Sequence, residues 1–212
     1  MPSTEIPTHT DTRIESIDTV WKGRFPMQIV RFRHRRFDGA MSGLRTWELW
    51  RRGNAAAVLP YDPASDSVVV IEQFRLPAQA AGLQPVLVEL AAGLAGENEL
   101  PEQVIRRESR EEMGLDVGRL EKIGDFLLTP GGSDENCSLY AGEVRLSNVP
   151  ADGVLGSFGL ESENEDIRVR VLPARVAIER AVAGEYPNSV TSLGLLWLGN
   201  RLDWLRALWS AP

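Results

Sequence analysis

The chain has 212 residues and a formal net charge of -7, with 43% hydrophobic and 25% charged residues. This length gives room for one sizeable hydrophobic core and a smaller appended element. The acidic charge argues against nucleic acid as a general partner, because binding a polyanion depends on clustered lysines and arginines.

The cysteine content and the apolar runs indicate in which cell compartment the protein is expected. The one cysteine, Cys137, cannot form an internal disulfide, and the first twenty residues are polar and lack the apolar stretch of a signal peptide. No apolar run approaches the roughly 18 residues of a membrane span. We therefore expect a soluble, cytoplasmic protein with no membrane partner.

The N-terminal quarter predicts a small β-rich element over residues 1–50. After about a dozen polar residues come the β-like stretches VWKG, MQIVRFRHR and LRTWELWRR, with a turn at Asp38 and Gly39. Seven arginines lie between residues 31 and 52, against Asp38 and Glu48. Two readings stay open: a solvated hairpin with its guanidinium groups outward, or a surface that faces an anionic small molecule.

The remaining residues, 51–212, predict one α/β (α+β) domain. Strands are expected at 55–61, 67–74 and 86–92, then in the stretches KIGDFLLT, NCSLYAGEV and DIRVRVLP. Helices are expected in PARVAIERAVAG and in the C-terminal stretch NSVTSLGLLWLGNRLDWLRALW. Strands on both sides of a central helix indicate a sandwich of helices and a sheet.

The central helix is predicted over residues 100–113 and carries an acidic face. Pro101 suits its first turn, and Gly114 suits its end. Glu108, Glu111 and Glu112 follow at spacings that place their carboxylates on one side of a helix. A hard divalent cation such as Mg²⁺ prefers oxygen ligands and keeps several waters, so this face predicts a metal platform.

The segment 93–115 resembles the Nudix box. Its fixed positions are filled by Gly93, Glu99, Arg107, Glu108, Glu111, Glu112, Gly114 and Leu115. The resemblance makes Glu108 and Glu112 ligands of one cation, with Glu111 sharing a second. Arg107 then holds Glu99 and orients the acidic face. One position departs from the pattern, since Ser109 stands where relatives carry an aliphatic residue.

Further stretches resemble the ADP-ribose pyrophosphatase family of Nudix hydrolases. These are RFRHRRFDGAMSG, GNAAAVLPYDP, VVVIEQFR, VELAAG, LLTPGGSDEN and ESENEDIRV, and Pro130 lies fifteen residues after Leu115, as in that family. The resemblance implies a Nudix α/β/α sandwich with a mixed sheet and hydrolysis of ADP-ribose to AMP and ribose 5-phosphate. It also implies Mg²⁺, replaceable by Mn²⁺, the carbonyl of Ala92 as a further metal ligand, and a homodimer that exchanges the N-terminal element.

The base that activates water is expected outside the acidic helix, because carboxylates committed to a metal are poor proton acceptors. By position in the family motif, Glu163 matches the catalytic glutamate and Glu165 a supporting carboxylate. Glu161 and Asp166 lie in the same loop, so the choice among the four acids stays open.

Contacts to the substrate follow from the same resemblance. Arg75 is a candidate for the phosphate or adenine side, and Glu135 for a ribose hydroxyl. Three aromatic residues are candidates for stacking on a base or, alternatively, for core or dimer packing: Phe25, Trp47 and Trp50. His9 and His34 lie near no candidate nucleophile, so a Ser-His or Cys-His hydrolase has no support.

Two rival functions remain at this stage. A pyrophosphatase for another nucleotide sugar, such as GDP-mannose, would use the same box. A non-catalytic Nudix module that binds a nucleotide would be free to lose the acidic residues, yet Glu108, Glu111 and Glu112 are all present.

Overall fold

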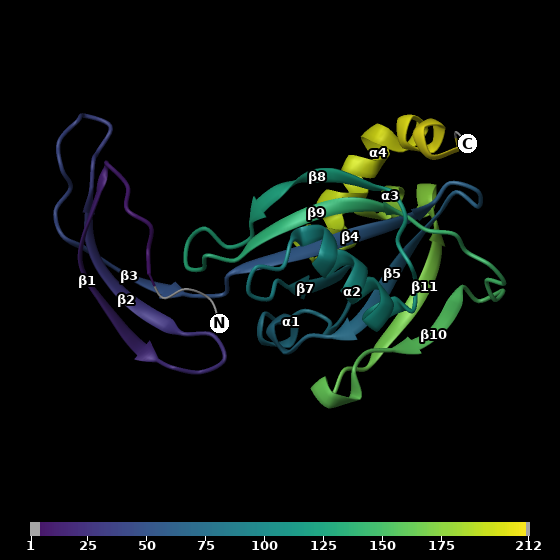
Figure 1. Ribbon diagram of the computed structural model, residues 1–212, viewed down its shortest axis with the longest axis horizontal. Coiled ribbons are helices and arrows are strands. Elements are labelled where there is room, and N and C mark those ends of the chain that lie inside the picture. Colours follow the sequence, from purple (N-terminus) through teal and green to yellow (C-terminus); the bar gives the residue numbers. More distant parts are fainter. Residues whose placement is uncertain (1–4, 211–212) are drawn as a thin grey trace. The chain divides into compact units, whose positions relative to one another are not determined.

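The computed structural model describes residues 5–210, apart from the side chain of Glu163. The chain divides into two compact units. The first unit comprises Met1–Asn54 and Phe126–Cys137, and the second comprises Ala55–Asp125 and Ser138–Pro212. Figure 1 labels the elements of both units along the chain.

The first unit contains a three-stranded antiparallel sheet. Its order is β1 (Thr12–Trp21), β2 (Met27–His34) and β3 (Arg45–Trp50), with β2 in the centre. The first strand starts at Thr12, where the sequence predicted only a short β-like stretch around Trp21. Most of the sheet is exposed, including Trp21 and Trp47, because three strands alone cannot cover both of their faces.

The second unit is built on an eight-stranded sheet of order β10-β11-β5-β4-β9-β8, with β6 paired to β5 and β7 paired to β4. The strands are β4 (Asn54–Asp62), β5 (Ser67–Phe74), β6 (Val86–Glu89), β7 (Ala91–Leu94), β8 (Leu120–Leu127), β9 (Asn136–Glu143), β10 (Val154–Phe158) and β11 (Ile167–Pro173). The sequence did not predict β10.

The predicted single strand over residues 86–92 is wrong. The chain forms β6 up to Glu89, paired with β5, and then β7 from Ala91, paired with β4. The change of partner occurs at Leu90, which is buried. An uninterrupted apolar run does not reveal such a break, because both halves are buried in the same sheet.

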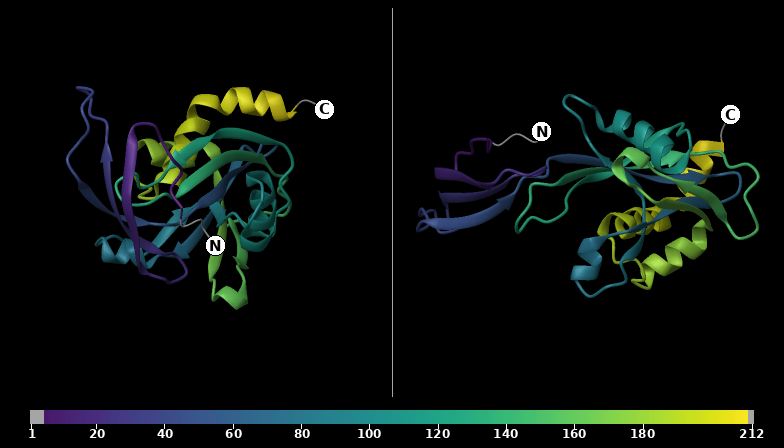
Figure 2. Two further views of the ribbon diagram at one scale, coloured as in Figure 1. Left: turned by 60° about the vertical axis from the view of Figure 1, so that its left-hand side comes forward. Right: turned by 90° about the horizontal axis from the view of Figure 1, so that it is seen from below.

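Helices cover both faces of this sheet. They are α1 (Leu76–Ala80), α2 (Pro101–Met113), α3 (Ala174–Val182) and α4 (Ser189–Ser210), with a short 3₁₀ turn at Glu161–Glu163. Figure 2 shows α2 on one face and α3 and α4 on the opposite face. The predicted α/β sandwich is therefore confirmed. Among the described helices, none is long and apolar enough to cross a membrane.

The helix α2 begins and ends for identifiable reasons. Pro101 occupies its first turn, and the side chain of Gln103 accepts the backbone N–H of Leu100 at 2.9 Å. Gly114 ends the helix in the left-handed conformation, at a φ of 65°. Val104 and Met113 pack into the core against the sheet. The opposite side of the helix is thereby left for charged residues.

Candidate functional site

The acidic face of α2 lies partly buried rather than fully in solvent. The Glu112 side chain is only slightly exposed, and Glu108 and Glu111 are 13% and 28% exposed. Burying three carboxylates side by side is unfavourable unless a cation compensates them. The arrangement therefore indicates a site built to receive positive charge.

Arg107 supplies part of that charge from within the chain. Its Nη1 donates to Oε1 of Glu108 at 2.6 Å and to Oε2 of Glu111 at 3.1 Å. Its Nε donates to Oε1 of Glu99 at 3.0 Å, and its Nη2 reaches the carbonyl of Leu94 at 3.3 Å. Hydrogen bonds from Arg107 hold the pKa of Glu99 below its usual value. One guanidinium thus joins the loop before α2 to two residues of the acidic face.

The end of β7 lies directly against this face. The backbone N–H of Ala92 donates to Oε2 of Glu112 at 2.9 Å. At Gly93 an added Cβ would overlap the Glu108 carboxylate and lie 2.5 Å from its Cγ. The glycine is needed because Glu108 occupies the space of a side chain. The backbone of Ala92 and Gly93 and the carboxylates of Glu108 and Glu112 are therefore neighbours.

Burial sets the protonation of the two inner carboxylates. It raises the pKa of Glu112 to about 8, and the negative charges of Glu108 and Glu165 act in the same direction. Burial also raises the pKa of Glu108, although the hydrogen bond from Arg107 opposes this. A cation bound here would reverse the effect, because it favours the ionised carboxylates.

The donor set fits a hard divalent cation, because it consists of carboxylate oxygens and a backbone carbonyl. Among the described side chains, which leave out Glu163, no three acidic, histidine or cysteine residues are arranged so that they alone could hold a metal ion. Arg107 occupies the side of Glu108 that faces Glu111. The carboxylates of the acidic face would hold a divalent ion only together with further oxygen ligands, such as waters.

The loop that follows β10 approaches the same helix. The backbone N–H of Gly159 donates to the carbonyl of Glu111 at 3.2 Å, which ties the start of the loop to α2. Oε2 of Glu165 accepts the N–H of Leu160 at 3.1 Å and closes the loop on itself. The negative charge of Glu165 contributes to raising the pKa values of Glu108 and Glu112. The side chain of Glu163 lies outside the described residues.

Arg75 lies in the second unit, directly after the end of β5. It immediately precedes α1, and Nε of its guanidinium donates to Oε2 of Glu89 at 2.8 Å. The Arg75 side chain is 42% exposed, so part of the guanidinium remains open to solvent. Its positive charge acts on Glu112. The effect of Arg75 on the pKa of Glu112 is smaller than that of burial.

The other predicted substrate residues belong to the first unit. Phe25 and Trp50 contact edge to face at 6.1 Å, and the guanidinium of Arg52 lies 4.1 Å from the Phe25 ring centroid and 4.8 Å from that of Trp50. Arg52 also donates to Oε1 of Glu135 at 2.9 Å. Arg52 belongs to the arginine-rich stretch of residues 31–52 and was not predicted as a site residue, although it contacts three of the candidates.

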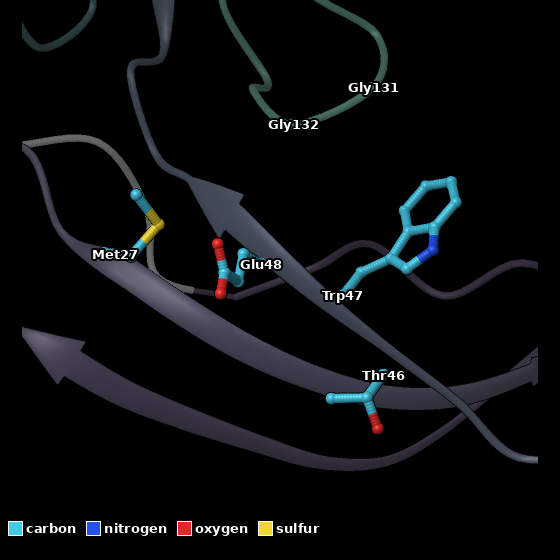
Figure 3. Close-up of a pocket in the computed structure, with 6 residues that line it drawn as sticks. All are labelled: Met27, Thr46, Trp47, Glu48, Gly131 and Gly132. Atoms are coloured by element: carbon cyan, nitrogen blue, oxygen red, sulfur yellow. The ribbon is translucent and has the colours of Figure 1, made fainter.

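Trp47 lines a surface hollow of about 480 Å³ in the same unit. Figure 3 shows its indole beside the loop that carries Gly131 and Gly132, with Glu48 and Met27 on the adjoining wall. The exposed aromatic ring of Trp47 suits stacking on a heterocyclic base.

Comparison with known proteins agrees with this geometry. A NUDIX domain model matches residues 51–187. The chain belongs to the NUDIX domain family. This Nudix hydrolase is 40% identical over 200 residues to the ADP-ribose pyrophosphatase of Escherichia coli strain K12. The aligned region covers 94% of this chain and 93% of the relative.

Two other relatives match this Nudix hydrolase over different lengths. The ADP-ribose pyrophosphatase of Haemophilus influenzae is 37% identical over 202 residues, covering 94% of this chain and 91% of the relative. The GDP-mannose pyrophosphatase of Salmonella arizonae is 38% identical over 152 residues, covering 71% of this chain and 76% of the relative. Nudix hydrolases generally use divalent metal ions. The roles of the individual site residues stay predictions.

Proposed function

We propose that the protein hydrolyses the diphosphate bond of ADP-ribose to AMP and ribose 5-phosphate with Mg²⁺, for which Mn²⁺ can substitute. The observation that carries the proposal is the similarity to two ADP-ribose pyrophosphatases over 94% of the chain. In the reaction, water adds to one phosphorus and the bridging P–O bond breaks. The attacking water gives up a proton, and the second phosphate leaves with the bridging oxygen.

The acidic face of α2 is proposed as the metal platform. Ala92, through its carbonyl, and Glu108, Glu111 and Glu112 would hold the ions. When bound, the divalent ions neutralise the phosphate charge that repels an incoming nucleophile. Arg107 keeps the carboxylates in place through its contacts to Glu99, Glu108 and Glu111.

Glu163 is proposed as the base that accepts the proton from the attacking water, with Glu165 as a supporting carboxylate. Two observations support a base in this loop. Its first residue, Gly159, is hydrogen-bonded to Glu111 on the acidic helix. The charge of Glu165 also acts on Glu108 and Glu112. A base held beside the metal platform lies within reach of a water that attacks a bound phosphate.

Four residues are proposed to bind the remaining parts of the substrate. Arg75 would contact a phosphate through the exposed part of its guanidinium, to which anions bind well. Glu135 would accept a hydrogen bond from a ribose hydroxyl. Phe25 and Trp47 are candidates for stacking on the adenine, and the exposed indole of Trp47 beside a hollow supports this role most directly.

A second candidate substrate is GDP-mannose, because a GDP-mannose pyrophosphatase matches 71% of the chain at similar identity. Purified protein should be incubated with MgCl₂ and a panel of nucleoside diphosphate derivatives, with AMP and ribose 5-phosphate identified as products. We expect the highest kcat/KM for ADP-ribose. A higher value for GDP-mannose would overturn the proposed substrate, and hydrolysis of no member of the panel would indicate a nucleotide-binding module.

A homodimer is proposed as the active form, with residues 1–50 as the dimerisation element and 51–212 as the catalytic domain. The three-stranded sheet leaves apolar side chains such as Val20 and Trp21 exposed, which supports burial of part of this sheet against a second copy. Light scattering at micromolar concentration should give about twice the chain mass of 23.5 kDa. A fully active monomer would contradict a site shared between copies. A cytoplasmic location stays a prediction.

A further inference from the structure

Glu89 is a buried carboxylate that none of the roles above uses. It is the last residue of β6 and is only 5% exposed. Its Oε2 lies 2.8 Å from Nε and 2.7 Å from Nη2 of Arg75. Its Oε1 accepts a hydrogen bond of 2.8 Å from Nδ2 of Asn188. Both oxygens are therefore engaged, as a carboxylate removed from water requires.

Asn188 is itself fixed at the start of α4. Its Oδ1 accepts the backbone N–H of Thr191 at 3.0 Å, the bond of a helix N-cap, and the hydroxyl of Thr191 at 3.2 Å. Thr191 is completely buried, and its hydroxyl also reaches the carbonyl of Val88 in β6 at 3.4 Å. The first turn of α4 thus determines where Glu89 lies, and Glu89 determines where Arg75 lies.

The remaining contacts of Arg75 leave part of its guanidinium exposed to solvent. The backbone N–H of Arg75 is held by the carbonyl of Pro85 at 2.7 Å, so the position of its Cα is fixed as well. One side of the guanidinium faces Glu89, and much of the side chain remains exposed to solvent. An arginine held in this way presents its free N–H groups without first losing the rotamer freedom of a long side chain.

We infer that Glu89 is a positioning residue for the hydrolysis: it holds the guanidinium of Arg75 in the orientation that receives the diphosphate of the substrate, and Asn188 holds Glu89. The inference rests on the proposed function, because it takes Arg75 as a phosphate contact. It adds that the start of α4, about a hundred residues further along the chain, takes part in substrate binding.

The chain offers a matched control in the pair of Arg119 and Glu143. Nε of Arg119 lies 2.8 Å from Oε2 of Glu143, the same distance as between Nε of Arg75 and Oε2 of Glu89. The side-chain exposures are 43% and 9% for Arg119 and Glu143, against 42% and 7% for Arg75 and Glu89. Glu143→Gln therefore measures the structural effect of losing such a pair in the same unit. It should lower thermal stability without changing KM.

The test is a double-mutant cycle of Glu89→Gln and Arg75→Ala, with kcat and KM measured at saturating MgCl₂. Glu89→Gln should raise KM roughly 10-fold, since a charge-assisted contact that orients Arg75 is lost, and should leave kcat within about threefold. Arg75→Ala should raise KM further. The double variant should equal Arg75→Ala alone, because Glu89 acts only through Arg75.

The outcomes separate this inference from the proposed function. If Arg75→Ala raises KM but Glu89→Gln does not, or if the two effects add, Glu89 does not position Arg75. If Arg75→Ala leaves KM unchanged, the phosphate role of Arg75 and the role of Glu89 both fail. The cycle should be run with whichever panel substrate the parent hydrolyses fastest, so an error in the proposed sugar nucleotide does not affect it.

A second variant tests the same inference if Glu89→Gln proves too unstable to be measured. Asn188→Ala removes the partner of Oε1 and leaves the charge pair with Arg75 intact. It should raise KM in the same direction by a smaller factor, with thermal unfolding followed alongside. An unchanged KM in a folded Asn188→Ala protein would overturn the role of the α4 start in holding Glu89.

Discussion

The backbone N–H of Ala92 donates a hydrogen bond of 2.9 Å to Oε2 of Glu112, twenty residues further along the chain. The carbonyl of the same alanine is a predicted metal ligand, and so is the Glu112 carboxylate. One peptide segment therefore orients both groups before any ion binds, and the entropy of arranging them is not lost on binding.

Glu112→Gln should reduce hydrolysis to background while leaving the fold intact. The amide oxygen of glutamine still accepts the N–H of Ala92, but the charge and a metal ligand are lost. Turnover and circular dichroism should be measured together. Glu102→Gln, on the same helix but exposed, is the control and should retain activity. Unchanged turnover of Glu112→Gln, or full turnover of the parent in excess EDTA, would show that this face binds no essential metal.

The metal-free protein should lose stability relative to Glu112→Gln as the pH rises. Burial raises the pKa of Glu112 from 4.5 to about 8, so the folded state holds this proton more tightly than the unfolded state does. The contribution of protonated Glu112 to the stability of the folded state is fully present below about pH 4.5. It is lost as the pH rises through about 8. Between about pH 4.5 and pH 8, the unfolding free energy of the parent relative to that of Glu112→Gln should fall by up to roughly 1.4 kcal/mol per pH unit.

Thermal unfolding of both proteins in EDTA at several pH values checks this linkage. The difference in Tm between variant and parent should grow from pH 5 to pH 8, and MgCl₂ at pH 8 should diminish it by binding to the parent. Parallel pH profiles for the two proteins would mean that Glu112 titrates normally in the folded state.

Glu163→Gln should lower kcat by roughly 10²- to 10⁴-fold, the range for a lost acid-base group, with KM for the substrate little changed. Mg²⁺ affinity should survive, since the acidic helix is unaltered. Steady-state kinetics and a metal titration by calorimetry provide the two measurements.

Glu161→Gln and Glu165→Gln decide which acid of the loop is the base. If either one carries the large loss in kcat instead, the register of the loop motif is misread. A Glu163→Gln enzyme within threefold of the parent would remove Glu163 from the mechanism.

Gly93→Ala should weaken Mg²⁺ binding by displacing Glu108, because the new Cβ would overlap the Glu108 carboxylate. The backbone itself tolerates alanine, since Gly93 is not among the glycines with positive φ. Gly96→Ala is the matched control, as its Cβ would lie 3.3 Å from Oε2 and 3.8 Å from Cβ of Glu99, without overlap. Equal Mg²⁺ affinities for the two variants, measured by calorimetry, would show that the close approach at Gly93 does not set the position of Glu108.

The amino-acid order was sufficient to predict the helix α2, its acidic face and the family. Pro101 and Gly114 mark the ends of the helix, and the spacing of Glu108 and Glu112 is a local property that helical geometry converts directly into a shared face. These features depend on residues within about one helix length of each other, so a pattern along the chain contains them.

The residues that surround the acidic face could be identified only from the folded chain. The break at Leu90, which the apolar run concealed, ends β6 at Glu89 and starts β7 at Ala91. This break sets Ala92 against Glu112 and leaves Glu89 between Arg75 and Asn188. The partners of Glu89 lie 14 and 99 residues away. Local patterns do not encode contacts across such separations, because strand pairing and helix packing in the complete fold create them.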